Sequence, residues 1–118
     1  MTVKECYEIF GGNYDEVISR LRTDERVIKF LLRVVEDGSY KLLCDSIESG
    51  NVDEAFRAAH TLKGVCGNLA ITRLGASSSE LTEILREKRV ISDELKPLLA
   101  RVAEDYELTI TAIKQLAQ

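Results

Sequence analysis

The chain has 118 residues, 45% of them hydrophobic and 31% charged, which suits a single globular domain over residues 1–118. Its 16 basic and 20 acidic residues leave a net charge of −4, which argues against a nucleic-acid partner because such partners select a basic face. A single histidine excludes metal sites built from several histidines, and no apolar run reaches the ~18 residues of a membrane span.

Two short helices are predicted at the N-terminal end. A run with helical apolar spacing covers residues 3–10 and stops at Gly11 and Gly12, since glycine disfavours a continuing helix. Asn13 can then accept a hydrogen bond from the free amides of a second short helix over residues 14–21.

A longer helix with one interruption is predicted next. Thr23 offers its hydroxyl to the first free amides. The apolar positions that follow share the three-and-four spacing of one buried face: Val27, Ile28, Leu31, Val34 and Val35. Asp37 and Gly38 interrupt this face, which resumes over residues 40–47 and stops at Gly50.

The longest continuous apolar stripe covers residues 52–69. Asn51 followed by Glu54 is typical of a helix start. The stripe then occupies every third or fourth position: Val52, Ala55, Phe56, Ala59, Leu62, Cys66 and Leu69. Residues 70–72 break the pattern, so we expect one helix over about 52–69 that carries the only histidine, His60.

Two more amphipathic helices complete the chain. The first runs from Leu74 to about Lys88, and the second is capped by Ser92 and has an apolar stripe over residues 95–113. Four long amphipathic segments with short connections predict an all-α fold, an antiparallel up-down four-helix bundle preceded by short N-terminal helices.

The cysteines and the N-terminal residues predict a cytoplasmic protein. Cys6, Cys44 and Cys66 are far apart and form no Cys-x-x-Cys pair, which favours reduced and mostly buried thiols over disulfides or a zinc site. Residues 1–10 interleave acidic residues with apolar ones and so lack the plan of a signal peptide.

His60 has unusual neighbours on the predicted helix. It lies at the flank of the apolar stripe, about 100° from its centre. Lys63 follows one turn later on the same side, and Gly64 and Gly67 leave positions four and seven without side chains. Each glycine costs about 1 kcal/mol relative to alanine inside a helix, so one reason to keep them is clearance around the imidazole.

Two interpretations of this pattern stay open at this point. An accessible imidazole, a cleared patch and a cation are typical of a nucleophile that receives an anionic group. A lone histidine on a helix flank is also an ordinary surface residue, and glycine occurs wherever a neighbouring helix approaches closely.

Residues 59–69, Ala-His-Thr-Leu-Lys-Gly-Val-Cys-Gly-Asn-Leu, resemble the motif of histidine-containing phosphotransfer (HPt) domains in two-component phosphorelays. The motif reads Ala-His-x-Leu-Lys-Gly followed by Asn-Leu-Gly, and the likeness extends to residues 11–14, 30–31, 48–51 and 81–86. Ala70 stands where the family usually has glycine, so we expect a local change in how this helix ends.

The resemblance implies a role for each matching residue. His60 would carry the phosphoryl group, Lys63 would neutralise its charge, and Gly64 would leave room for it. Thr82 and Arg86 match positions on the next helix that face the phosphoryl group, as a hydroxyl donor and a second cation. Gly67 is expected as a further residue that faces the phosphoryl group.

The resemblance also implies the partners. They would be a response-regulator receiver domain or a hybrid histidine kinase, with magnesium on the receiver and no cofactor on this chain. The chain has no nucleotide-binding loop, so we expect a phosphocarrier and not an enzyme. A four-helix bundle from one chain needs no partner to close its core, so we expect a monomer. Phe56, Val65 and Ile71 are expected to rim His60 and dock the receiver, in an interface near or below ~1,200 Å².

The main alternative is a non-catalytic helical adaptor, in which His60 is structural and therefore buried and hydrogen-bonded. A di-metal bundle needs carboxylate-x-x-His motifs, and Arg57 stands three residues before His60 where the carboxylate would be. The charges of Arg57 and Lys63 disfavour a haem held by His60 alone. The intact His60, Lys63 and Gly64 disfavour a phosphotransfer-like domain that has lost its activity.

Overall fold

Seven α-helices and no strand make up the structure, a computed structural model that describes residues 1–118. This confirms the predicted all-α class. The helices are α1 (Val3–Phe10), α2 (Tyr14–Leu21), α3 (Asp24–Glu36), α4 (Ser39–Ser49), α5 (Val52–Leu69), α6 (Thr72–Lys88) and α7 (Leu95–Leu116).

Three of the four capping residues predicted from the sequence begin a helix in the structure. Asn13, Thr23 and Asn51 accept hydrogen bonds from backbone amides three residues later, at 3.0 to 3.2 Å. Ser92 is a wrong prediction, because α7 begins at Leu95 without a side-chain cap. Only the backbone carbonyl of Ser92 contributes, by accepting from the Leu95 amide at 3.1 Å.

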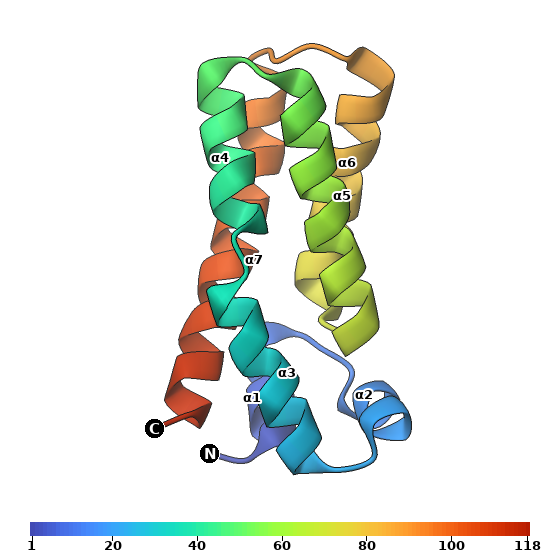
Figure 1. Cartoon of the computed structure of the whole chain (residues 1–118), viewed down its shortest axis with the longest axis vertical. Helices are drawn as coiled ribbons and strands as arrows, with labels where there is room; N and C mark the ends of the chain where they lie inside the picture. The colour runs from blue at the N-terminus through green and yellow to red at the C-terminus, as the bar shows by residue number, and fades with distance from the viewer.

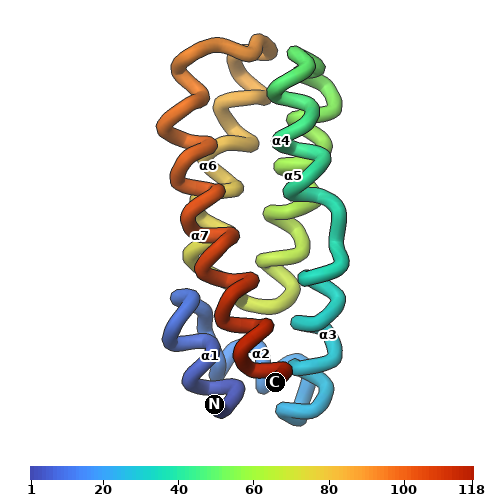
Figure 2. Tube along the Cα trace, turned by 90° about the vertical axis from the view of Figure 1, so that its left-hand side faces the viewer, coloured from blue at the N-terminus to red at the C-terminus, as the bar shows by residue number.

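The longer helices lie side by side along a body of 42 × 25 × 19 Å (Figure 1). Helix α5 packs between α4 and α6, and α6 packs against α7. Helices α3 and α4 follow one another along the same side, and α7 runs nearly the full length, as the second view shows (Figure 2). Both termini lie near α1 and α2, at the end of the molecule where α5 ends.

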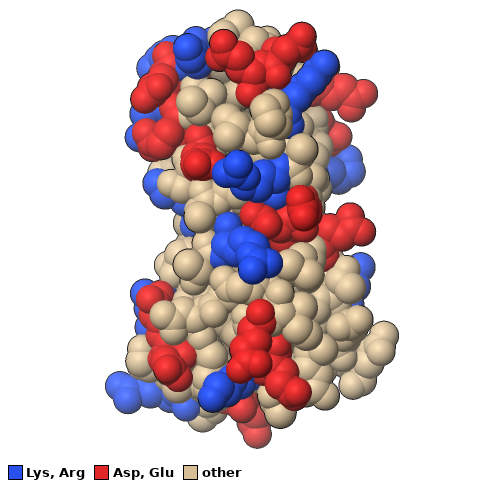
Figure 3. All heavy atoms as spheres, turned by 180° about the vertical axis from the view of Figure 1, so that it is seen from behind, with Lys and Arg blue, Asp and Glu red and all other residues tan.

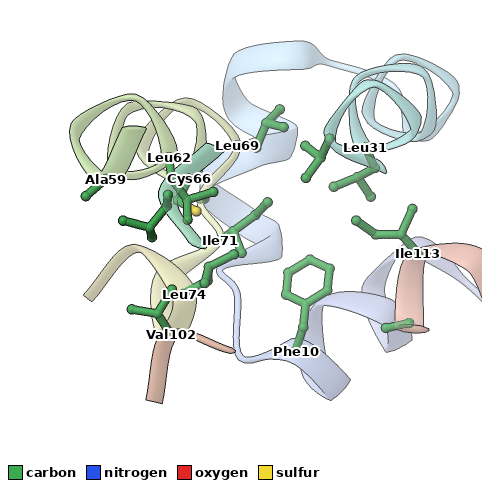
Figure 4. Packing of buried hydrophobic residues seen from close by; sticks show 14 of the residues in the cluster. Phe10, Leu31, Ala59, Leu62, Cys66, Leu69, Ile71, Leu74, Val102 and Ile113 are labelled. Atoms are coloured by element: carbon green, nitrogen blue, oxygen red, sulfur yellow. The ribbon is translucent and has the colours of Figure 1, made fainter. Parts of the chain in front are cut away.

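One cluster of 24 buried hydrophobic residues forms the core. Figure 4 shows Cys66, Ile71 and Leu74 close together, with Phe10 and Ile113 extending the cluster toward the N-terminal helices. Burying a large apolar side chain stabilises the fold by roughly 1.5–3 kcal/mol, so this cluster dominates the stability.

The C-terminal end of α5 is tied to the N-terminal helices. The Tyr7 hydroxyl donates to the backbone carbonyl of Leu69 at 2.8 Å, and the Asn13 amide donates to the carbonyl of Ala70 at 2.9 Å. Ala70 adopts a left-handed conformation with φ of 54°, which costs a non-glycine residue roughly 1–2 kcal/mol. These contacts offset that cost and fix the point where α5 ends.

The surface carries both signs of charge. Figure 3 shows Lys and Arg interleaved with Asp and Glu over the rear face of the molecule. None of the seven helices combines the length and apolar content needed to cross a bilayer.

Candidate functional site

Helix α5 presents His60 on the side that faces away from the core. Ala59 and Leu62 on the same helix are buried, whereas His60 is exposed. Its imidazole makes no hydrogen bond and no ion pair with the rest of the chain. The Phe56 ring, one turn earlier, stacks beside it with 6.0 Å between ring centroids and 17° between planes. An aromatic wall therefore borders an imidazole whose nitrogens are free for another group.

The two glycines that follow His60 border open space. A Cβ atom built on Gly64 or Gly67 meets no atom within 4 Å. Close helix packing therefore does not require either glycine within this chain. The contrast is Gly75 on α6, where a Cβ would lie 3.2 Å from the Cβ of Cys66 on α5. Gly75 therefore permits close packing of α6 on α5, whereas Gly64 and Gly67 border open space.

Two cations lie on the same side as His60. Lys63 is half-buried, one turn after His60, and forms no ion pair. Arg86 on α6 donates from Nη1 to Glu83 at 2.8 Å, and its guanidinium lies over the Phe56 ring, 5.4 Å from the centroid. Phe56 thus contacts both His60 and Arg86 and links the two helices at the site.

Thr82 does not face the site as a free donor, which corrects the sequence expectation. It is fully buried on the side of α6 that faces the core, and its hydroxyl donates to the backbone carbonyl of Ser78 at 2.7 Å. Thr82 and Arg86 share one side of α6, but only the long arginine side chain reaches across to α5.

Two of the three expected docking residues are also misplaced. Ile71 is fully buried in the core and offers no surface to a partner. Val65 is half-buried and, five residues after His60, projects about 140° away around α5. It lines a groove with Phe30 and Leu69 next to α3. Only Phe56 borders His60 as expected.

Arg20 on α2 is a contact that sequence reasoning missed. Its Nη1 donates to the backbone carbonyls of Gly67 at 2.7 Å and Asn68 at 3.2 Å, and its Nη2 pairs with Glu16 at 2.8 Å. The guanidinium satisfies carbonyls at the C-terminal end of α5, where a positive charge is favourable. Since Arg20 and Gly67 are 47 residues apart, no local pattern reveals the contact.

The remaining titratable groups give no second reactive centre. No three side chains among His, Cys, Asp and Glu come together as metal ligands would. The three cysteines are free thiols. Burial raises the pKa of the Cys66 thiol to about 12, so this side chain is protonated at neutral pH and is a poor nucleophile.

Comparison with known proteins gives one match. The family model of the Hpt domain matches residues 14–117, which is nearly the whole chain and includes the segment around His60. No curated protein and no solved structure matches this chain.

Proposed function

Since this chain belongs to the Hpt domain family, we propose that it is a phosphorelay intermediate that accepts a phosphoryl group on His60 and exchanges it with an aspartate of a receiver domain. Family membership supports a phosphotransfer role in two-component systems, in which such domains act as phosphocarriers without an ATP site of their own. The acceptor residue and the aspartate exchange are the finer part of the proposal.

The single observation that carries the proposal is the state of His60. A structural histidine, as in the adaptor alternative, would be buried and hydrogen-bonded. His60 is exposed, makes no hydrogen bond, and precedes two glycines that border open space. The site therefore has a free nucleophile and room for a tetrahedral anion beside it.

The transfer step follows from the chemistry of these groups. The ring nitrogen of His60 that carries no hydrogen attacks phosphorus, and an N–P bond forms. The bond between phosphorus and the aspartate oxygen breaks, and its electron pair stays on the aspartate carboxylate. Phosphoryl transfer asks the protein mainly for position and charge stabilisation. We expect Lys63 and Arg86 to supply that stabilisation, which is supported by the cation–π contact of Arg86 with Phe56 beside His60.

The proposal extends to the arrangement and the partners. We infer that α3 with α4, α5, α6 and α7 form the antiparallel up-down bundle expected from the sequence, as one monomeric domain over residues 1–118. The packing of α5 between α4 and α6, and of α6 against α7, supports it. A receiver domain would dock over His60 in the cytoplasm and bring the magnesium ion, while this chain itself holds no metal or cofactor.

The test is transfer from a receiver domain phosphorylated with radiolabelled acetyl phosphate. The wild-type chain should take up a label that is labile to acid and stable to base, and His60→Gln should take up none. His60 is the only histidine, so phosphohistidine on the intact chain can have only one location. Thr61→Ser, an exposed change at the variable position of the motif that keeps the hydroxyl bonded to the Arg57 carbonyl, controls for the effect of substitution. Equal labelling of His60→Gln would overturn the proposal.

A further inference from the structure

Helices α5 and α6 lie side by side (Figure 1). A pocket of about 280 Å³ lies between the start of α5 and the end of α6. Its apolar lining is Val52, Phe56 and Leu85, and its charged lining is Asp53, Arg86 and Arg89. This volume is close to the lower end of the roughly 300–1,000 Å³ that small-molecule sites occupy, and it is large enough to admit one inserted side chain.

The pocket is continuous with the proposed docking face. Phe56 lines the pocket and also stacks beside the His60 ring. Phe56 lies four residues before His60 on α5, and Val52 lies eight residues before it. At a rise of 1.5 Å per residue, the pocket therefore lies roughly 6–12 Å from His60 along α5. A partner that buries about 600 Å² on this chain covers a disc of about 14 Å radius. A receiver centred on His60 therefore covers the pocket.

The charged lining has more hydrogen-bond donors than acceptors. Arg89 is exposed, ends α6 in a left-handed conformation and forms no ion pair. Arg86 gives only its Nη1 to Glu83, and Asp53 is the one carboxylate in the lining. Each guanidinium has five N–H donors in a planar fork that matches a carboxylate. The lining therefore selects an acceptor group, with an apolar wall beside it for a short methylene stem.

We propose that this pocket is a specificity subsite that receives an acidic side chain, Glu or Asp, from the receiver domain docked on His60, with Arg89 as its main contact. The inference rests on the proposed function, because it takes the receiver as the partner. It adds that partner choice depends on a charge contact outside the reacting atoms. Such contacts act on encounter and affinity more than on the chemical step.

The experiment compares Arg89→Glu with the wild-type chain, using a set of receiver domains phosphorylated with acetyl phosphate. For the receivers that transfer fastest, Arg89→Glu should raise the KM for the receiver about tenfold and leave the maximal transfer rate within twofold. Arg89→Lys keeps the positive charge but lacks the planar guanidinium, so its KM for the receiver should lie between those of the wild-type chain and Arg89→Glu. Lys29→Glu on α3 makes the same charge change at an exposed position outside the pocket and should alter neither quantity.

The outcomes separate the two proposals. If the wild-type chain takes no label from any receiver, the proposed function fails and this inference falls with it. If the wild-type chain is labelled and Arg89→Glu has an unchanged KM for every receiver, the subsite is refuted while the phosphocarrier role stands. A lower maximal rate at unchanged KM would also refute it, since the pocket would then act on the chemistry and not on docking.

Discussion

Alanine at position 64 should make the protein more stable and its phosphotransfer slower. Gly64 lies inside α5, where glycine is about 1 kcal/mol less favourable than alanine. The new Cβ meets no atom within 4 Å, so no clash within the chain offsets this gain. For a domain of this size, 1 kcal/mol raises Tm by about 4 °C. The same methyl group enters the open space that the proposed function assigns to the phosphoryl group and the receiver.

The assay pairs thermal unfolding by circular dichroism with transfer from a phosphorylated receiver. We expect Gly64→Ala to slow transfer and Gly64→Gln, with a longer side chain on the same open surface, to slow it further. Gly75→Ala is the matched control for stability, because its Cβ would lie 3.2 Å from that of Cys66 and the gain in helix propensity would be opposed. A lower Tm for Gly64→Ala would show that the new Cβ does clash within the chain. An unchanged transfer rate in Gly64→Gln would show that transfer does not need the open space beside residue 64.

The remaining predictions concern Lys63 at the site, the buried Thr82 as its control, and the buried thiol of Cys66. Lys63→Ala should slow transfer about tenfold, because it removes an unpaired cation. Thr82→Val should leave transfer unchanged and lower the free energy of unfolding in urea by about 1 kcal/mol, because it removes only the buried hydrogen bond to Ser78. Equal transfer rates in the two variants would contradict the role of Lys63. Burial raises the pKa of Cys66 from the ordinary 9.0 to about 12, so the folded chain holds this proton where the unfolded chain releases it. Its contribution to stability is complete below pH 9 and is lost as the pH rises toward 12, so urea unfolding between pH 8 and 10 should show a steeper fall for the wild-type chain than for Cys66→Ala. If the stability of both chains fell equally with pH, the Cys66 thiol would not be the cause of the fall.

The features of the site that lie on one helix were predictable from the sequence. His60, Lys63, Gly64 and Gly67 are within eight residues, and helical geometry fixes their relative directions once α5 is recognised. Phe56 follows from the same geometry, one turn earlier. The structure adds what no spacing contains, namely that nothing in the chain occupies the space beside the glycines.

The features that depend on how two helices are rotated against each other were not predictable. Thr82 and Arg86 are four residues apart on α6, and the sequence treats them alike. In the structure the short side chain of Thr82 bonds within its own helix, while the longer one of Arg86 reaches Phe56. Ile71 fails as a docking residue for a related reason, because the turn between α5 and α6 carries it into the core.

The two glycines after His60 are unfavourable for the stability of the isolated chain. Gly64 and Gly67 cost about 1 kcal/mol each, and no contact within the chain offsets that cost. Local rules that fail without compensation are expected at functional sites. Lys63 and Arg89 also have no ionic partner, but this does not distinguish them, because Lys29 and Arg73 outside the site are unpaired too. Both glycines lie on the His60 side of α5, and we propose that a phosphoryl group and a docked receiver domain fill the space they leave.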